Sequence, residues 1–172
     1  MSAGQRVKTG SIHWNTPPKY TIPIKEFFKG RIDLDPCSNE GSIVQAKTEL
    51  YEGGLEYNWG QHKNIFVNPP YGRNGKTSIY HWLQKCYGLP NSEVIALIPV
   101  APNTKHWKEF VFNSSIICFL SDTRLKFMID GSTNNKGASM ACCLVYWGNN
   151  KENFLAQFNS LGVCCAVIKE NT

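Results

Sequence analysis

The stretch Asn64-Ile65-Phe66-Val67-Asn68-Pro69-Pro70-Tyr71 decides the fold and points to the chemistry of this chain. Its first four residues predict a short buried strand, and the two prolines then stop the strand and stiffen the turn. The amide oxygen of Asn68 and the carbonyl oxygen of Pro69 can both accept hydrogen bonds from one amino group. Tyr71 offers an aromatic face on which a planar base can stack. The stretch therefore predicts a strand that ends in a site for amino-group chemistry on a flat ring.

Strand and helix signals alternate along the rest of the chain, which predicts an α/β fold with a mostly parallel central sheet and helices on both faces. The unbroken apolar run at 94–100 predicts a central strand covered on both faces. Residues 124–129 and 139–147 are expected to form an antiparallel edge hairpin across the loop 130–137, and 48–63 is expected to be rich in loops. The other expected strands are 31–36, 115–120 and 163–168, and the expected helices are 40–47, 77–87, 103 or 104 to 113, and 150–160.

Two motifs follow predicted strands directly. Asp35-Pro36 ends the strand at 31–36, and Asn68-Pro69-Pro70-Tyr71 ends the strand at 64–67. In open parallel sheets, ligands bind beyond the carboxyl ends of the strands, at the point where the strand order reverses. Both motifs are therefore expected to lie at one ligand site.

The length and composition predict one globular domain. At 172 residues the chain is large enough to bury a core without disulfides or metals. We expect residues 1–12 to be a flexible arm and 13–172 to be a single domain without a separate target-recognition domain. No run of 18 apolar residues suggests a membrane span, and the start lacks the apolar core of a signal peptide. A cytoplasmic location is expected.

The formal net charge of +5 suits a polyanionic partner. Arg73 and Lys76 directly follow the tetrapeptide, where they could contact phosphates that flank a bound base. The other interpretation of this stretch is a solvated loop.

The cysteine and histidine patterns do not predict a metal site. The seven cysteines form no C-x-x-C pair, and the four histidines are scattered. Cys142-Cys143 and Cys164-Cys165 lie in apolar runs, where adjacent side chains point to opposite faces of a strand. They are expected to be small, reduced core residues.

Five motifs occur in an order that resembles the phage-type Dam family of DNA adenine methyltransferases. The tetrapeptide itself is similar to the signature of amino-methyltransferases that use S-adenosylmethionine. The resemblance covers the chain from about Trp14 to Trp147. Its motifs are His13-Trp14-Asn15-Thr16-Pro17-Pro18, Ile32-Asp33-Leu34-Asp35-Pro36-Cys37, Gly53-Gly54-Leu55-Glu56-Tyr57-Asn58-Trp59, Asn68-Pro69-Pro70-Tyr71 and Arg124-Leu125-Lys126-Phe127.

The resemblance implies a Rossmann-like methyltransferase fold, S-adenosylmethionine as cofactor and double-stranded DNA as partner, with no obligate protein partner. Asp35 would meet the cofactor's ammonium group, although a turn carboxylate can also cap a helix. Either Glu52 or Glu56 would bind the cofactor's ribose. The implied cofactor-binding residues are Trp14, Thr16, Pro17, Asp35, Pro36 and Cys37, the implied catalytic residues are Asn68, Pro69, Pro70 and Tyr71, and the implied DNA contacts are Arg73, Lys76, Arg124 and Lys126.

The implied reaction is methylation of the exocyclic amino group of adenine after the base has left the helix. Two alternatives remain open: an amino-methyltransferase that acts on RNA or on protein glutamine, and a catalytically silent DNA-binding module. One departure from many methyltransferases is the single glycine at 37–41, where a Gly-x-Gly turn is common. Short loops such as 130–137 would set sequence specificity. By analogy the enzyme would be encoded by a phage or prophage, work in the bacterial cytoplasm, and mask DNA from restriction.

Overall fold

The computed structural model describes residues 14–72, 75–122, 125–129, 132–133 and 140–168. The predicted flexible arm at 1–12 lies outside these residues, and so do Arg73 and Arg124. The extent of the domain therefore stays a prediction.

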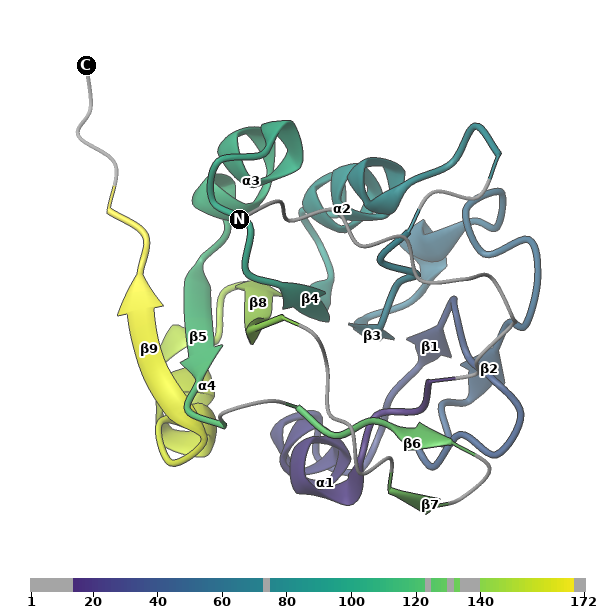
Figure 1. Cartoon of the computed structure of the whole chain (residues 1–172), viewed down its shortest axis with the longest axis horizontal. Coiled ribbons are helices and arrows are strands. Elements are labelled where there is room, and N and C mark those ends of the chain that lie inside the picture. The colour runs from purple at the N-terminus through teal and green to yellow at the C-terminus, as the bar shows by residue number, and fades with distance from the viewer. Residues whose placement is uncertain (1–13, 73–74, 123–124, 130–131, 134–139, 169–172) are drawn as a thin grey trace.

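The centre of the fold is a mixed sheet of seven strands (Figure 1). Its strands are β1 (Leu34–Asp35), β2 (Thr48–Glu49), β3 (Asn64–Val67), β4 (Glu93–Pro99), β5 (Ile116–Leu120), β8 (Cys142–Trp147) and β9 (Gly162–Ala166). They lie in the order β2-β1-β3-β4-β8-β5-β9. The first four of these run parallel to one another, β8 lies antiparallel between β4 and β5, and β9 is an antiparallel edge strand beside β5.

Helices cover both faces of this sheet. One face carries α1 (Pro18–Phe27) and α4 (Lys151–Phe158), and the other carries α2 (Ile79–Tyr87) and α3 (Lys105–Glu109) (Figure 1). Two short 3-10 turns, η1 (Trp59–Gln61) and η2 (Val111–Asn113), complete the second layer. This arrangement confirms the predicted α/β class with a parallel core and helices on both faces.

Strand β4 shows how the sequence builds two cores. Side chains alternate along a strand, so a fully apolar run supplies both faces at once. Ile95 and Leu97 join the core under α1 and α4, while Val94, Ala96 and Ile98 join the core under α2 and α3. All five are fully buried, and each large apolar side chain contributes about 1.5–3 kcal/mol. The prediction of a central strand at 94–100 is confirmed.

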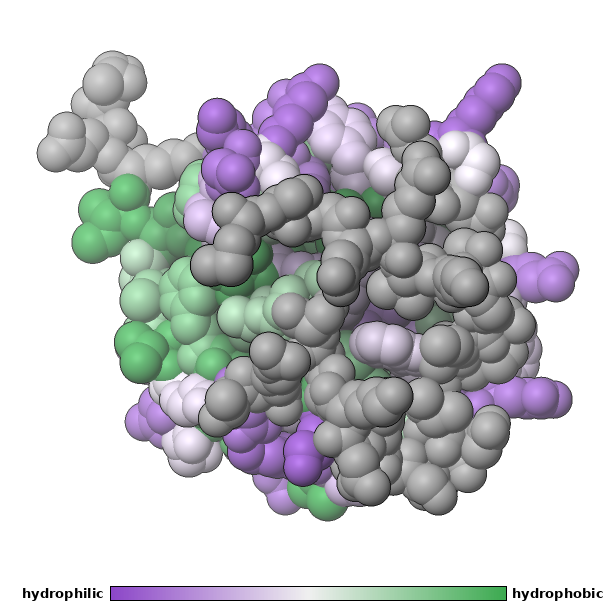
Figure 2. All heavy atoms as spheres, in the orientation of Figure 1, coloured by the Kyte–Doolittle hydropathy of each residue, from purple (hydrophilic) through white to green (hydrophobic). Residues whose placement is uncertain are grey.

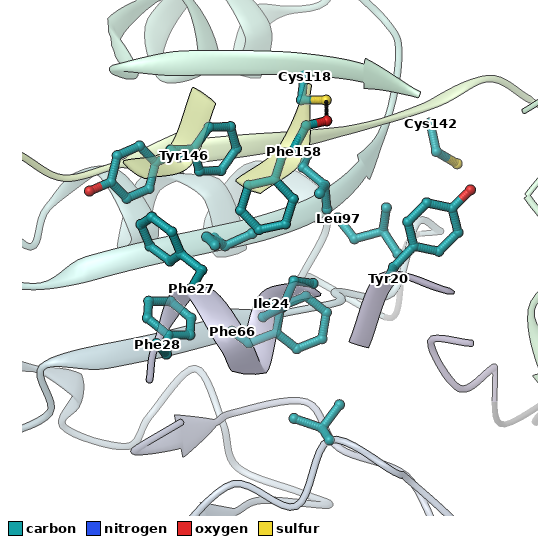
Figure 3. Packing of buried hydrophobic residues seen from close by; sticks show 14 of the residues in the cluster. Tyr20, Ile24, Phe27, Phe28, Phe66, Leu97, Cys118, Cys142, Tyr146 and Phe158 are labelled. Atoms are coloured by element: carbon teal, nitrogen blue, oxygen red, sulfur yellow. Dashed lines mark hydrogen bonds between the residues drawn. The ribbon is translucent and has the colours of Figure 1, made fainter. Parts of the chain in front are cut away.

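Aromatic side chains pack α1 against α4. The ring of Phe27 lies edge-on to Tyr146 on β8, with ring centroids 5.4 Å apart, and edge-on to Phe154 on α4 at 5.8 Å. Phe154 in turn contacts Phe158, with centroids 4.4 Å apart. Figure 3 shows Phe27, Phe28, Tyr146 and Phe158 gathered in this core. Edge-on pairs of this kind add stability beyond the apolar area that they bury.

Helix α2 forms where the sequence predicts it. Ser78 precedes its first turn, and the backbone N–H of Ser78 donates to Nδ1 of His81 at 3.2 Å. Gly88 follows its last turn. The helix buries the apolar stripe expected from its spacing, namely Trp82, Leu83 and Cys86.

The predicted helix at 40–47 is wrong. Gly41 and Gln45 have φ angles of 73° and 54°, in the left-handed region that interrupts a right-handed helix. The backbone N–H groups bond locally instead, as where Ala46 donates to Oε1 of Glu49 at 3.2 Å. The segment is a loop whose apolar contribution to the core is Val44.

Helix α1 was not predicted. Its start is compatible with Pro18, because the first helical residue needs no N–H donor, but Pro23 inside it argued against a helix. Tyr20, Ile24 and Phe27 recur at helical spacing and are buried. The burial of this stripe outweighs the cost of the internal proline.

The predicted hairpin of 124–129 with 139–147 is also wrong. Met128 lies in β6 (Met128–Ile129), which pairs with β7 (Ser132–Thr133) in a separate two-stranded ribbon. Strand β8 already uses both of its edges, one for β4 and one for β5. It therefore has no edge left for 124–129, and the antiparallel part of the sheet is β8 with β5 and β9.

The edge strand β9 is exposed along much of its length. Figure 2 shows apolar residues gathered on the side of the molecule where β9 lies. Val163 is 64% exposed and Cys165 is exposed. The prediction that Cys164 and Cys165 are both core residues is wrong for Cys165. None of the helices in the described part of the chain has the length and apolar run that a membrane crossing needs.

Candidate active site

The two predicted motifs meet at one edge of the sheet. Strands β1 and β3 are parallel neighbours, with Leu34 opposite Ile65. Asp35 ends β1, and Asn68 follows the last residue of β3. Because parallel strands end at the same edge, Asp35 and Asn68 lie at the same edge of the sheet, as expected.

Two hydrogen bonds fix the amide of Asn68. Its Nδ2 donates to the carbonyl oxygen of Trp14 at 3.2 Å, and its Oδ1 accepts from the hydroxyl of Tyr71 at 3.3 Å. An amide held at both ends cannot rotate freely, so the position of its oxygen is set. That oxygen has two lone pairs, and one of them remains for a ligand's amino group.

Tyr71 holds Asn68 only loosely. Its single hydroxyl proton is shared between Asn68 and the carbonyl oxygen of Leu97, which lies 3.2 Å away. Both distances exceed the usual 2.7–2.8 Å of such bonds. Burial, helped by the thiol of Cys142, raises the pKa of Tyr71 well above its usual range, so the phenol stays a donor. Its half-buried ring lies edge-on to Phe127, with centroids 6.1 Å apart.

The segment at 14–17 contacts the residue after β3 and the loop that follows β1. Trp14 accepts from Asn68, and its ring contacts Phe127 with centroids 5.0 Å apart. Asn15 donates from Nδ2 to the carbonyl oxygen of Glu40 at 2.9 Å and exchanges two backbone bonds of 2.9 Å with Met128. Contacts on three sides therefore hold this segment over the site.

Asp35 is a buried acid. It is 3% exposed, and its Oδ1 accepts from the backbone N–H of Cys37 at 3.2 Å. Burial is the largest influence and raises the pKa of Asp35 to about 7; the Cys37 bond lowers it, and the charge of Glu49 raises it further. Among the residues that the structure describes, no cation pairs with Asp35. A ligand with a positive group would satisfy this carboxylate.

Two buried hydroxyls near the strand ends form no hydrogen bond of regular geometry with the described residues. Within the described residues, three buried side-chain oxygens have no hydrogen bond, and two of them are Oγ1 of Thr16 and Oγ of Ser38. The Ser38 hydroxyl lies near enough to lower the pKa of Asp35, although it forms no bond of regular geometry. An unpaired buried hydroxyl costs about 1–3 kcal/mol. Such groups fit a site that is completed by a polar ligand.

Cys37 lies between the two strand ends. Burial and the charge of Asp35 raise the pKa of its thiol well above the usual range, against a smaller effect of the backbone N–H of Asn68. A neutral thiol is a poor nucleophile. This environment suits a small wall residue.

Gly54 allows its loop to pack closely against the turn at Pro36. A Cβ atom at Gly54 would lie 1.8 Å from the carbonyl oxygen of Pro36, so only glycine fits there. The indole Nε1 of Trp59 donates to the carbonyl oxygen of Gly54 at 2.7 Å, and Lys85 donates to the carbonyl oxygen of Tyr57 at 2.5 Å. Trp59 is 1% exposed and is therefore a core residue that supports this loop.

Replacing Gly54 with alanine is expected to destabilise the protein by about 1–3 kcal/mol, because the added methyl group must push the two loops apart. Because the displaced loop includes Pro36, next to Asp35, weaker binding of a ligand at this strand end is expected as well. Chemical denaturation measures the first effect. Gly88→Ala is the control: its Cβ would meet nothing closer than 3.4 Å. Equal stability of the two variants would contradict a role for the close approach.

The structure identifies an acid that the sequence analysis missed. Glu49 ends β2 and lies opposite Asp35 in the register of β1 and β2. The two predicted candidates, Glu52 and Glu56, are exposed in the following loop. A strand of two residues gives almost no sequence signal, so the position of Glu49 at a strand end could not be inferred.

The four predicted DNA contacts are only partly placed. Lys76 and Lys126 are exposed. Lys126 lies between the buried residues Leu125 and Phe127, so the chain presents it outward. Arg73 and Arg124 lie outside the described residues. In the described parts of the chain, no three His, Cys, Asp or Glu side chains are grouped so that they could hold a metal ion.

The family of the chain follows from a comparison with known protein families. The family model described as "DNA N-6-adenine-methyltransferase (Dam)" matches residues 5–161, a range that contains both strand ends and the segment at 14–17. No curated protein and no solved structure matches the chain. The family match spans far more than half of the 172 residues and confirms the resemblance seen in the sequence. The chain therefore belongs to the Dam family of DNA N-6-adenine-methyltransferases, and it is an enzyme of that family.

Proposed function

We propose that this enzyme transfers a methyl group from S-adenosylmethionine to the exocyclic amino group of a flipped adenine in DNA, with Asn68 and Pro69 as the acceptors for that amino group. One observation carries the proposal. The oriented amide of Asn68 lies at the strand end next to a buried, unpaired carboxylate, Asp35. A site for an amino group thus adjoins a site for a cation.

The Asn-Pro-Pro sequence supplies two oxygens for one amino group. The bond to Trp14 occupies Nδ2 of Asn68, and Oδ1 accepts only the long bond from Tyr71, so Oδ1 is the end of the amide that would accept from the amino group. Among the described residues, none donates to the carbonyl oxygen of Pro69. Two accepted hydrogen bonds favour a tetrahedral amino nitrogen whose lone pair is localised. Positioning and electrostatics then supply most of the rate, and no strong general base is required.

The residues around Asp35 fit S-adenosylmethionine, whose sulfonium supplies an electrophilic methyl group when it is bound. Asp35 would hold the ammonium group of the cofactor, and this contact would favour the ionised form of the carboxylate. The hydroxyl of Thr16, which has no partner among the described residues, and that of Ser38 beside Asp35 would bond its polar atoms. Glu49, at the neighbouring strand end, would accept from its ribose hydroxyls. Cys37 and Pro36 would form the wall towards Asn68.

Positive and aromatic side chains would hold the DNA. Lys76 and Lys126 are exposed and would contact phosphates beside the extruded base, together with Arg73 and Arg124. Tyr71 is half-buried, and its accessible part would stack on the adenine. The weak bond from Tyr71 to Asn68 would be given up when the amino group arrives.

The test is transfer of labelled methyl from S-adenosylmethionine to unmethylated duplex DNA, followed by nucleoside analysis of the product. We expect the label in 6-methyladenine. A duplex of guanine and cytosine alone is the matched control, and it should remain unlabelled. Label in methylcytosine, or no transfer to any adenine-containing duplex while calorimetry shows bound cofactor, would contradict the proposal. In the second case RNA and protein glutamine would be tested as acceptors.

A further inference from the structure

Two cysteines face each other across the last two strands of the sheet. Cys118 on β5 lies opposite Cys164 on β9 in the antiparallel register. The ladder continues to Ser121, whose backbone N–H donates to the carbonyl oxygen of Leu161 at 3.0 Å. In such a ladder, pairs that exchange backbone hydrogen bonds alternate with pairs that do not. Ser121 and Leu161 are a hydrogen-bonded pair. Cys118 and Cys164 lie three positions further along the ladder and are therefore a non-hydrogen-bonded pair.

Residues of a non-hydrogen-bonded pair lie closer together than those of a hydrogen-bonded pair. Their Cα atoms are typically about 4.5 Å apart, which is within the range of about 4.4–6.8 Å that a disulfide spans. Both side chains also point to the same face, because directly opposite residues share a face. The register therefore gives the two cysteines a Cα separation that a disulfide can span.

The environment of the two thiols agrees with this placement. Sγ of Cys118 donates to the carbonyl oxygen of Phe158 at 3.6 Å, a contact drawn in Figure 3. Burial raises the pKa of both thiols, and contact with Cys118 lowers that of Cys164 in part. Cys118 is fully buried, whereas Cys164 is half-buried and lies on the edge strand. Cys164 is thus the thiol that a small oxidant reaches first.

We propose that Cys118 and Cys164 form an oxidisable dithiol, which hydrogen peroxide converts into a cross-strand disulfide within one chain. All seven cysteines are free in this structure, which represents the reduced state. The site lies on β5 and β9 at one edge of the sheet, separated from the strand ends of β1 and β3 by β4 and β8.

The reaction balances in two steps. The sulfur of Cys164 attacks one oxygen of the peroxide, the O–O bond breaks, and the products are a sulfenic acid and one water that takes up the thiol proton. The sulfur of Cys118 then attacks the sulfenic sulfur, the S–O bond breaks, and a second water leaves with the Cys118 proton. Two thiols are oxidised and one peroxide is reduced.

The neighbouring cysteine provides the contrast. Cys165 is exposed, but its side chain points to the opposite face of β9 and lies opposite Ile117. A bond between Cys164 and Cys165 would join adjacent residues and strain the peptide unit between them. Oxidation of Cys165 should therefore stop at a sulfenic acid or higher oxide, while Cys164 proceeds to the disulfide.

The disulfide would tie the edge strand to the sheet. It would close the chain between β5 and β9, which includes β8 and α4. Constraining the unfolded chain in this way is expected to raise the melting temperature by about 5–10 °C. Reduction should reverse the shift.

The test is peptide mapping of the peroxide-treated protein without reduction. Trypsin should give peptide 109–124, which holds Cys118, linked to peptide 152–169, which holds Cys164 and Cys165. Cys165→Ser should keep the link, and Cys164→Ser should lose it together with the rise in melting temperature. Oxidation of Cys165 in the wild-type protein shows that the peroxide has reacted.

Other results would overturn the proposal. The first is the absence of the link although Cys165 has been oxidised. The second is a link that persists in Cys164→Ser. The third is a link that joins two chains, which size-exclusion chromatography would show as a dimer. Melting curves of both serine variants in the reduced state show whether each still folds. If Cys164→Ser melts well below the wild-type protein, Cys164→Ala provides the same test without a buried hydroxyl.

Discussion

Replacing Asn68 with alanine is expected to lower the rate of methyl transfer by about 100-fold or more, which is the typical loss when one oriented electrostatic contact is removed from a transition state. Alanine removes the oxygen that would accept the adenine amino group, and it also removes the bonds to Trp14 and Tyr71. The loss should appear in kcat, while the affinity for S-adenosylmethionine changes little. Single-turnover transfer and calorimetry measure the two quantities separately.

Asn64→Ala is the matched control for this prediction. Asn64 begins the same strand, and its side chain donates to the carbonyl oxygen of Arg31 at 2.9 Å, away from the site. Its loss should cost some stability and leave the rate within a few-fold of the wild-type value. Equal rates for the two variants would exclude Asn68 from the transition state. A second variant, Asn68→Asp, keeps acceptor oxygens and should retain more activity than Asn68→Ala.

Replacing Asp35 with asparagine is expected to weaken the binding of S-adenosylmethionine by at least about 30-fold, because one partner of a buried charge pair is removed. The same change should stabilise the cofactor-free protein at pH 8. The carboxylate is buried and has no cationic partner among the described residues, so its charge opposes folding. We expect a rise in melting temperature of about 5 °C at pH 8. Calorimetry and thermal melts at one pH measure both effects.

The sign of the pH dependence follows from the raised pKa of Asp35. Its folded value is about 7, against an ordinary value of 3.8, so the folded state holds this proton more tightly than the unfolded chain. The contribution of Asp35 to stability is full below pH 3.8 and is lost as the pH rises to about 7. Binding of the cofactor's ammonium has the opposite trend, because it needs the ionised carboxylate. Affinity should rise up to about pH 7, and this rise should be lost in Asp35→Asn.

Asp33→Asn is the control for Asp35. Asp33 lies on the same segment and is also buried, but its carboxylate pairs with Arg31 at 2.7 Å and accepts from the backbone N–H of Asn64 at 2.9 Å. Burial raises its pKa, but these bonds outweigh burial and lower the net value. Asparagine at this position should therefore destabilise the protein and leave cofactor binding within a few-fold. If Asp35→Asn destabilised the protein to the same degree, the carboxylate of Asp35 would have a stabilising partner, and the prediction would be wrong.

The features that the sequence predicted well are those with strong local signals. The run at 94–100 could only be a strand covered on both faces, and the apolar stripe of α2 between Ser78 and Gly88 has the helical period. The placement of Asp35 and Asn68 at one edge followed from a general rule for parallel sheets. These local signals were enough to place the two motifs at one edge of the sheet.

The features that were missed depend on tertiary contacts or on single backbone angles. The left-handed conformations of Gly41 and Gln45 are incompatible with the helix expected at 40–47. Helix α1 keeps Pro23 because it buries Tyr20 and Ile24 against the sheet, a gain that the helix's own sequence does not show. Glu49 escaped attention because a two-residue strand acquires its position only through pairing with β1.

The place of β8 in the sheet has a consequence for the order in which the protein can fold during synthesis. Strand β4 pairs with β8 over residues 94–99, which meet residues 142–147. A chain that is still being made can pair β4 with β3, but the other edge of this apolar strand stays open until β8 has left the ribosome. Such pairing over long sequence separation is slow, and an open apolar edge can join another chain in the meantime. The sheet that presents Asn68 and Asp35 is thus completed late, and translation that stops before β8 would leave an aggregation-prone fragment.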